Sequence, residues 1–229
     1  RFTNIDLEIR PNTYVNWHPG QEPPSLKSLI ADKISVDKIL IKGWDKVKES
    51  DYDFVLPIMS APFALKSGKN IPDKIVFGIK NSSSKWDVAI NWKGSKHHFN
   101  DKHRSMNEQH LLQILNSNPN LKFVSLNIDT VDFSCDNFTQ DVSSVDTVDK
   151  LLDTVLSSRL VLTVDSMIAH LAGGTDVPTI VMQPYSPDWR WGLESSDCIW
   201  YDNITNIRQT KINDWDAVIE QVNIKLSQF

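Results

Sequence analysis

The sequence predicts an α/β fold built on a parallel β-sheet. Two apolar runs rich in β-branched residues, at 88–92 and 160–164, are typical of buried strands. Between them, Val148, Leu151 and Val155 occupy the i, i+3 and i+7 positions of one helical face. Strands that alternate with helices in this way form right-handed βαβ units, whose strands are parallel.

The elements after residue 86 continue this alternation to the C-terminus. Ser105 and Glu108 form a capping-box pair, which predicts the start of a helix that ends near Asn118. Asp214 stands at the N-cap position of the last helix, in front of an apolar face. Strands are expected at 88–92, 122–126, 160–164 and 179–182, and further helices at 148–155 and 166–172. Gly173 is expected to end the 166–172 helix with a positive φ.

The first 80 residues carry fewer elements than a complete doubly wound domain needs. Short strands are expected at 5–9, 38–41 and 54–57, and a helix at 25–33 follows two prolines. The chain also begins at Arg1 rather than at a methionine. We therefore expect a truncated or processed product in which this first domain is incomplete.

The domain boundary is expected near the polar segment NSSSK at 81–85, which is the best linker candidate. Residues 1–80 would form a partial N-terminal α/β domain. Residues 86–229 would form a C-terminal domain with a doubly wound parallel sheet.

Composition and charge exclude several functional classes. The chain has 229 residues, 40% hydrophobic content and a net charge of −5, without the basic surplus that a nucleic-acid-binding protein usually carries. No apolar run approaches the length of a membrane span. Its two cysteines are too few for a disulfide scaffold, and no secretory signal is visible. These features favour a cytoplasmic protein.

The turn after the 160–164 strand is the first candidate site. Asp165 and Ser166 open the 166–172 helix, and the N–H groups at a helix N-terminus attract phosphate. A strand–turn–helix of this kind is where parallel α/β proteins bind nucleotides. His170 lies four residues after Ser166, on the same helical face. It would contact a phosphate or sugar, or else it is a half-buried histidine with an internal hydrogen bond.

A second candidate loop follows the 88–92 strand. Lys93, Gly94 and Arg104 suit a phosphate-facing loop, because cations neutralise charge and glycine admits close backbone approach. The alternative is a solvated surface loop. The histidines within it (His97, His98 and His103) match no tight metal-ligand spacing, so no metal site is expected.

The loop after the 179–182 strand is rich in aromatic residues. Tyr185, Trp189 and Arg190 could stack on a base or sugar and pair with phosphate, or the aromatic residues could simply pack over the sheet edge. The Asp-x-Asp triplets at 51–53 and 214–216 are too short to predict a metal–nucleotide site. The sequence contains no Walker A, G-x-S-x-G or G-x-G-x-x-G motif.

Three segments together resemble a known family. They read VDSMIAHLAGGTDVPTIVMQPYSPDWRW, INWKGSKHHFNDKHRS and WYDNITNIRQTKINDWDAVIEQV. They are similar to the C-terminal nucleotide-sugar domain of heptosyltransferase-like (family 9) glycosyltransferases, above all to bacterial versions attached to tetratricopeptide repeats. The resemblance covers residues 86–226.

The resemblance implies a GT-B fold, in which two Rossmann-like domains face a cleft. It implies a nucleotide-diphospho-sugar as donor substrate, without a metal or other cofactor. The acceptor hydroxyl, on a glycan, a lipid-linked molecule or a protein, would attack the anomeric carbon with inversion. By position, the residues at the donor diphosphate would be Lys93, Gly94, Arg104, Ser105, Asp165, Ser166, Met167 and His170.

The N-terminal half departs from the family pattern. The Gly-x-Gly-Asp turn that carries the candidate base aspartate in similar enzymes is absent, and Glu8, His18 and Asp53 are unsupported substitutes. No catalytic residue is therefore predicted. The sequence leaves open a glycosyltransferase, a non-catalytic nucleotide-sugar-binding module, and a scaffold that has kept the fold without the ligand.

Overall fold

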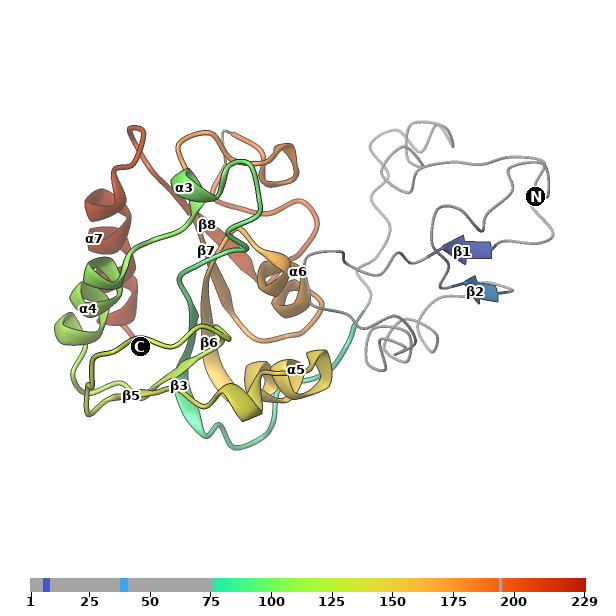
Figure 1. The fold of residues 1–229 in the computed structure, drawn as a ribbon, viewed down its shortest axis with the longest axis horizontal. Coiled ribbons are helices and arrows are strands. Elements are labelled where there is room, and N and C mark those ends of the chain that lie inside the picture. Colours follow the sequence, from blue (N-terminus) through green and yellow to red (C-terminus); the bar gives the residue numbers. More distant parts are fainter. Residues whose placement is uncertain (1–5, 9–37, 41–75, 194) are drawn as a thin grey trace. The chain divides into compact units, whose positions relative to one another are not determined.

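The chain divides into two compact units, residues 1–73 and 74–229. A computed structural model describes residues 6–8, 38–40, 76–193 and 195–229 (Figure 1). In the first unit, β1 (Asp6–Glu8) and β2 (Lys38–Leu40) pair in parallel. These strands fall within two of the predicted ones. The helix expected at 25–33, the strand at 54–57, and the side chains of His18 and Asp53 lie outside the described residues.

The second unit is built on a six-stranded sheet in which every strand pairing is parallel. Its spatial order is β5-β4-β3-β6-β7-β8, so the order reverses between β3 and β6. This is the order of a doubly wound, Rossmann-like sheet. The strands are β3 (Trp86–Asn91), β4 (Phe123–Ser125), β5 (Phe138–Thr139), β6 (Ser158–Val164), β7 (Thr179–Gln183) and β8 (Ile204–Arg208).

Helices cover both faces of the sheet (Figure 1). On one face lie α4 (Glu108–Ser117) and α7 (Trp215–Leu226), which pack against each other. On the other lie α5 (Val148–Leu156) and α6 (Met167–Gly173). This arrangement confirms the predicted α/β class and parallel sheet. The helix layers are needed because the central strands carry apolar residues on both faces.

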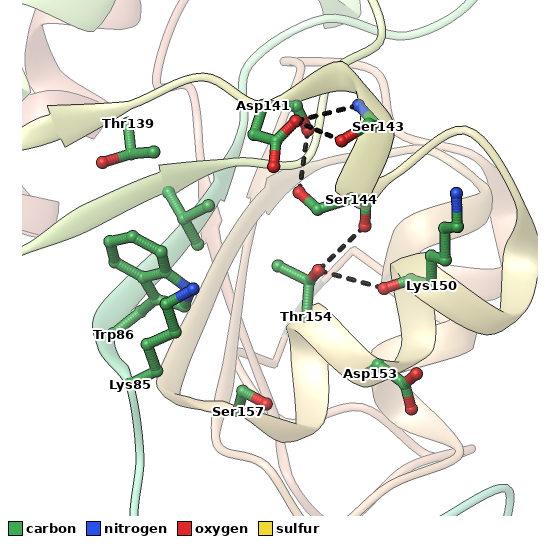
Figure 2. A pocket seen from close by; sticks show the side chains of 11 residues that line it. Lys85, Trp86, Thr139, Asp141, Ser143, Ser144, Lys150, Asp153, Thr154 and Ser157 are labelled. Atoms are coloured by element: carbon green, nitrogen blue, oxygen red, sulfur yellow. Dashed lines mark hydrogen bonds between the residues drawn. The ribbon is translucent and has the colours of Figure 1, made fainter.

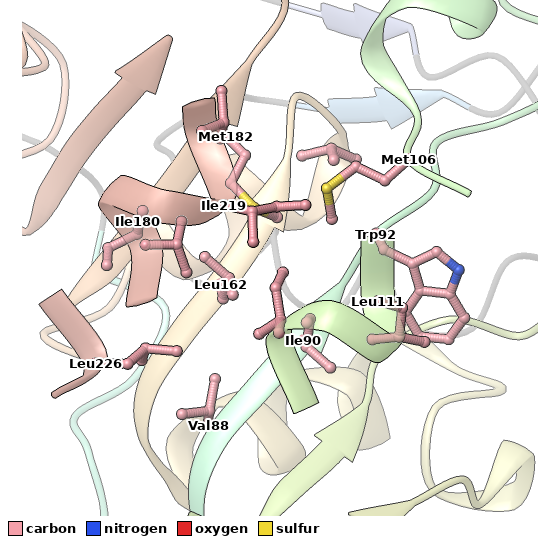
Figure 3. Packing of buried hydrophobic residues seen from close by; sticks show 14 of the residues in the cluster. Val88, Ile90, Trp92, Met106, Leu111, Leu162, Ile180, Met182, Ile219 and Leu226 are labelled. Atoms are coloured by element: carbon pink, nitrogen blue, oxygen red, sulfur yellow. The ribbon is translucent and has the colours of Figure 1, made fainter. Parts of the chain in front are cut away.

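The larger core lies between the sheet and the α4–α7 layer (Figure 3). Val88, Ile90 and Leu162 project from β3 and β6 and are fully buried. Leu111 of α4 and Val218 of α7 belong to the same cluster on the helix side and are also fully buried. Each such side chain contributes roughly 1.5–3 kcal/mol by leaving water, so this layer fixes the sheet in place.

The structure corrects the predicted start of α4. The helix begins at Glu108, and its N-cap is Asn107, whose side chain accepts a hydrogen bond from the His110 N–H. The expected Ser105–Glu108 capping box is wrong, because Ser105 is the extended C-cap of a separate short helix, α3 (Asp101–Arg104). Part of the predicted polar loop is therefore helical.

Strands β5 and β8 were not predicted from the sequence. The first is a two-residue edge strand, and the second carries polar residues among its isoleucines, so neither shows an apolar run. The expected linker at 81–85 instead lies against the end of α5, where the Asn81 side chain donates to Ser157 Oγ at 2.9 Å. The boundary between the compact units falls earlier, between residues 73 and 74.

The end of α6 is also corrected. Gly173 is the last residue of the helix and Gly174 is its C-cap with φ −76°; the only described glycine with a positive φ is Gly192. What Gly173 provides is space, because a Cβ built on it would lie 2.6 Å from the Tyr201 ring. The glycine allows α6 to approach the segment before β8.

We expect Gly173→Val to lower the free energy of unfolding by about 1–3 kcal/mol, since the added atoms overlap the half-buried Tyr201 ring. Urea denaturation would measure the change. The penalty should shrink in a Tyr201→Leu background, because the two residues are in contact and their effects are then not additive. Equal penalties in both backgrounds would contradict the steric explanation.

Candidate functional site

The candidate site lies where the strand order reverses. Strands β3 and β6 are neighbours there, with Asn91 opposite Thr163 in the parallel register. The chain leaves β3 toward Lys93 and leaves β6 at Asp165, so the two segments that the sequence singled out lie side by side. The carboxyl ends of strands at such a switch point are the usual ligand site of an open α/β sheet.

Asn91 ties the two strand ends together, and sequence reasoning missed it. Its Oδ1 accepts hydrogen bonds from Thr163 Oγ1 at 2.9 Å and from Ser166 Oγ at 3.0 Å. Its Nδ2 donates to the carbonyl of Lys93 at 2.8 Å. The available signal was a buried amide at the end of an apolar strand, since buried polar groups are normally hydrogen-bonded.

Arg104 connects the loop after β3 with the turn after β6. Only 8% of the residue is exposed. Its Nη1 donates to the Asp165 carbonyl at 2.8 Å, its Nη2 to the Ser95 carbonyl at 3.5 Å, and its Nε to Asp101 Oδ1 at 3.3 Å. A buried charge is costly unless it is paired and hydrogen-bonded, and these contacts meet that need. Arg104 therefore positions the loops.

Gly94 and Ser105 complete the same network. A Cβ on Gly94 would lie 2.5 Å from Arg104 Nη2, so the group that this glycine admits is the guanidinium. The Gly94 N–H donates to Ser105 Oγ at 2.8 Å, and Ser105 Oγ donates to Asp101 Oδ1 at 2.7 Å. Of the candidate phosphate-facing residues in this loop, Lys93 is the one with an accessible side chain.

Lys93 is held by a single carboxylate. Its Nζ lies 3.6 Å from Glu108 Oε1, and the two side chains are 29% and 47% exposed. An exposed ion pair of this kind contributes little to stability, because water screens it. The ammonium can therefore exchange Glu108 for an anionic ligand at low cost.

The turn after β6 starts α6 as predicted. Ser166 is the N-cap, and its Oγ accepts the N–H of Ile168 at 3.2 Å. The N–H of Met167 has no hydrogen bond to any residue that the structure describes. The Met167 side chain is 56% exposed. This turn therefore offers one backbone donor beside Lys93.

Asp165 is joined to an aromatic cluster that the sequence did not connect with it. Its Oδ1 accepts a hydrogen bond from Trp191 Nε1 at 2.9 Å. The Trp191 ring stacks on His170, with centroids 5.0 Å apart and planes 21° apart. His170 Nδ1 lies 3.1 Å from the hydroxyl of Tyr201. Trp191 and Tyr201 thus belong to the site and come from the aromatic loop and the segment before β8.

The histidine in this cluster is neutral near pH 7. Burial lowers the pKa of His170, although Asp165 nearby acts in the opposite direction. Burial also raises the pKa of the Tyr201 hydroxyl. A neutral imidazole beside a neutral phenol suits hydrogen bonding to a ligand better than charge neutralisation.

The aromatic loop after β7 is folded partly on itself. The Arg190 guanidinium lies over the Trp189 ring, with its Cζ 5.0 Å from the ring centre. Trp200 Nε1 donates to the Arg190 carbonyl at 2.8 Å. Arg190 also pairs with Asp188 at 2.6 Å. Tyr185 is 51% exposed at the carboxyl end of β7. Trp189 and Trp200 therefore serve packing within the loop, whereas Tyr185 is accessible to a ligand.

Comparison with protein-family models, with curated proteins and with solved structures finds no match.

Within the described ranges, no group of three or more metal-ligating side chains comes together, and His103 contacts Asn213 at 2.8 Å. None of the helices in that part of the chain has the length and apolar character to cross a membrane.

We expect His170 to make stability depend on pH. Its native pKa is below the usual 6.5, so the unfolded chain binds a proton more readily than the native state does. Stability should fall as the pH drops below about 6.5, whereas above that value both states are neutral and the effect vanishes. Urea unfolding at neutral and acid pH should show a smaller loss in His170→Gln.

The unfolding experiment on His170→Gln needs one control, because burial also lowers the pKa of His110. His110→Gln reports the share of the acid loss that arises outside the aromatic cluster. If His170→Gln retains the whole acid loss of the unmodified chain, the histidine is not held neutral by its surroundings.

Proposed function

We propose that the chain is a glycosyltransferase of the heptosyltransferase-like type with a GT-B architecture, and that residues 86–229 bind its nucleotide-diphospho-sugar donor. The acceptor is a hydroxyl of a glycan, a lipid-linked molecule or a protein. The transfer inverts the anomeric carbon and requires no metal ion.

One observation carries this proposal. Lys93 and Asp165, from segments separated by about seventy residues of sequence, meet at the point where the strand order of the sheet reverses. Arg104 and Asn91 hold these segments at a fixed separation. A site held by buried hydrogen bonds on rigid strand ends is preorganised for a ligand.

The chemistry of the site suits a diphosphate leaving group. As the anomeric carbon loses the nucleoside diphosphate, negative charge grows on the phosphate oxygen. Lys93 can move from Glu108 to that oxygen, and the Met167 N–H can donate to it. Such donors lower the barrier because they stabilise charge where it develops. Neutral His170 and exposed Tyr185 can contact the sugar or the base.

The alternative is a nucleotide-sugar-binding module without transferase activity. It is favoured by the absence from the sequence of a Gly-x-Gly-Asp turn. Two of the substitutes considered for that base, His18 and Asp53, lie outside the described residues. The two functions share the donor site and differ only in turnover.

We expect Lys93→Ala to raise the dissociation constant for a nucleoside diphosphate roughly tenfold or more, since a charge-assisted hydrogen bond contributes about 1.5–3 kcal/mol. Glu108→Gln should act in the opposite direction, because it frees the ammonium. A thermal-shift panel with ADP, UDP, GDP, TDP, CMP and inorganic phosphate would measure both effects, since ligand bound to the native state raises Tm.

Lys102→Ala is the matched control for that panel, because it removes an exposed lysine from the same loop region. A shift with one nucleotide that survives Lys102→Ala but not Lys93→Ala supports the donor site and names the base. If none of the nucleotides raised Tm, both functions would be excluded, and a scaffold that has lost its ligand would be favoured.

Turnover separates the two remaining functions. For a transferase, we expect donor-dependent transfer or hydrolysis that falls roughly 100-fold in Asp165→Ala, because the aspartate orients Trp191 and the turn at the reacting diphosphate. Asp165→Asn retains an oxygen for the indole N–H and serves as the folding control. Nucleotide binding without any turnover would identify the binding module.

A further inference from the structure

A cavity lies away from the carboxyl end of the sheet (Figure 2). Its volume is about 410 Å³, within the range of small-molecule sites. Trp86, the first residue of β3, and Ser157, which directly precedes β6, both line it. It therefore opens beside the amino ends of the central strands, on the face that α5 covers. Nothing proposed for the donor site depends on this cavity.

One wall of the cavity is an aromatic surface on the sheet. Trp86 of β3 shares this wall with Val124 of β4, and Figure 2 shows the Trp86 indole across the cavity from α5.

The opposite wall is polar and firmly held. Thr154 of α5 donates to the Ser144 carbonyl at 3.0 Å, which fixes the 3-10 turn η4 (Val142–Ser144) against the helix. Asp141 Oδ1 accepts from Ser143 Oγ at 2.6 Å and from its N–H at 3.0 Å. The Ser143 hydrogen bonds and the charges of nearby lysines lower the pKa of Asp141, so its carboxylate is ionised.

Charges of both signs line the cavity. Asp141 and Asp153 supply two carboxylates, and Lys85 and Lys150 supply two ammonium groups. Lys150 is already paired with Asp146 at 2.9 Å. The Asp153 carboxylate has no hydrogen bond or ion pair with any described residue. With Lys150 engaged by Asp146, the lining offers two carboxylates and the Lys85 ammonium group, so an anionic ligand is disfavoured. The mixture of acceptors and donors suits a neutral ligand that is rich in hydrogen-bonding groups.

We propose that this cavity binds one neutral sugar ring of a glycan. A sugar ring has an apolar face of C–H groups, which the Trp86 indole can cover, and hydroxyls at its edge. The unpaired Asp153 carboxylate and the free oxygen of Asp141 accept from those hydroxyls, as charged acceptors form the stronger hydrogen bonds. Lys85 Nζ, now 4.9 Å from the centre of the Trp86 ring, moves aside and donates to the sugar.

The displacement of Lys85 is not a barrier. A cation over an aromatic ring at an exposed site is held only weakly, and the ammonium regains a hydrogen bond when it turns to a sugar oxygen. The cavity would thus hold a glycan at the amino end of the sheet, while the proposed donor site lies at the carboxyl end.

The test follows the Trp86 resonance by ¹⁹F NMR in the full chain labelled with 5-fluorotryptophan, with Trp86→Phe assigning the signal. The probes are the methyl glycosides of glucose, galactose, mannose, rhamnose and N-acetylglucosamine, each up to about 50 mM, since single sugar rings bind at millimolar levels at best. We expect at least one probe to shift the signal saturably, and Asp153→Asn to weaken that binding roughly tenfold.

Asp149→Asn is the matched control, because it removes an exposed carboxylate from the same helix outside the cavity. Inorganic phosphate and Nα-acetyl-lysine methylamide test anionic and cationic ligands. Any of four results would overturn the proposal: no saturable shift with a glycoside, a preference for either charged probe, equal weakening in Asp149→Asn, or unchanged affinity in Asp153→Asn. Nucleotide binding in Asp153→Asn should equal that of the unmodified chain, which keeps this test separate from that of the donor site.

Discussion

The parallel pairing of β3 with β6 is the constraint on which the second unit depends. Because the strand order reverses at this pair, the connections on its two sides must cover opposite faces of the sheet, which places α4 on one face and α5 and α6 on the other. The same reversal separates the loops that leave the two strands. It opens the space in which the candidate site is built, and the α4–α7 core holds both strands in position.

A buried guanidinium stabilises that opening. Arg104 reaches the backbone of both loops, and its charge is balanced by Asp101. The arrangement accounts for Gly94 and Ser105, since the first leaves room for the guanidinium and the second joins the Gly94 N–H to Asp101. The loop residues that resemble a phosphate-binding motif thus divide into those that support the site and Lys93, which is available to a ligand.

The two ends of the sheet offer different chemistry. At the carboxyl end, a lysine, a backbone donor and a neutral histidine surround the switch point, which suits a diphosphate and the groups it carries. At the amino end, an indole faces carboxylates, an ammonium group and hydroxyls, which suits the neutral sugar ring that we propose. The two proposed sites are compatible with one glycan-processing protein, because a long substrate contacts more surface than the reacting atoms occupy.

The sequence by itself determined the α/β class, strands β3, β6 and β7, and helices α5 and α7, because these elements carry strong apolar periodicity. It also placed Lys93 and Asp165 each directly after a predicted strand, whereas the tertiary structure made those two strands neighbours. Only the tertiary structure decided the pairing of the short or polar strands β5 and β8, the two-residue displacement of the α4 N-cap from Ser105 to Asn107, and the aromatic cluster that Asp165 joins. The physical reason is that periodicity records which side chains are buried, whereas the contacts of Gly94, Gly173 and Trp191 join residues far apart in the chain.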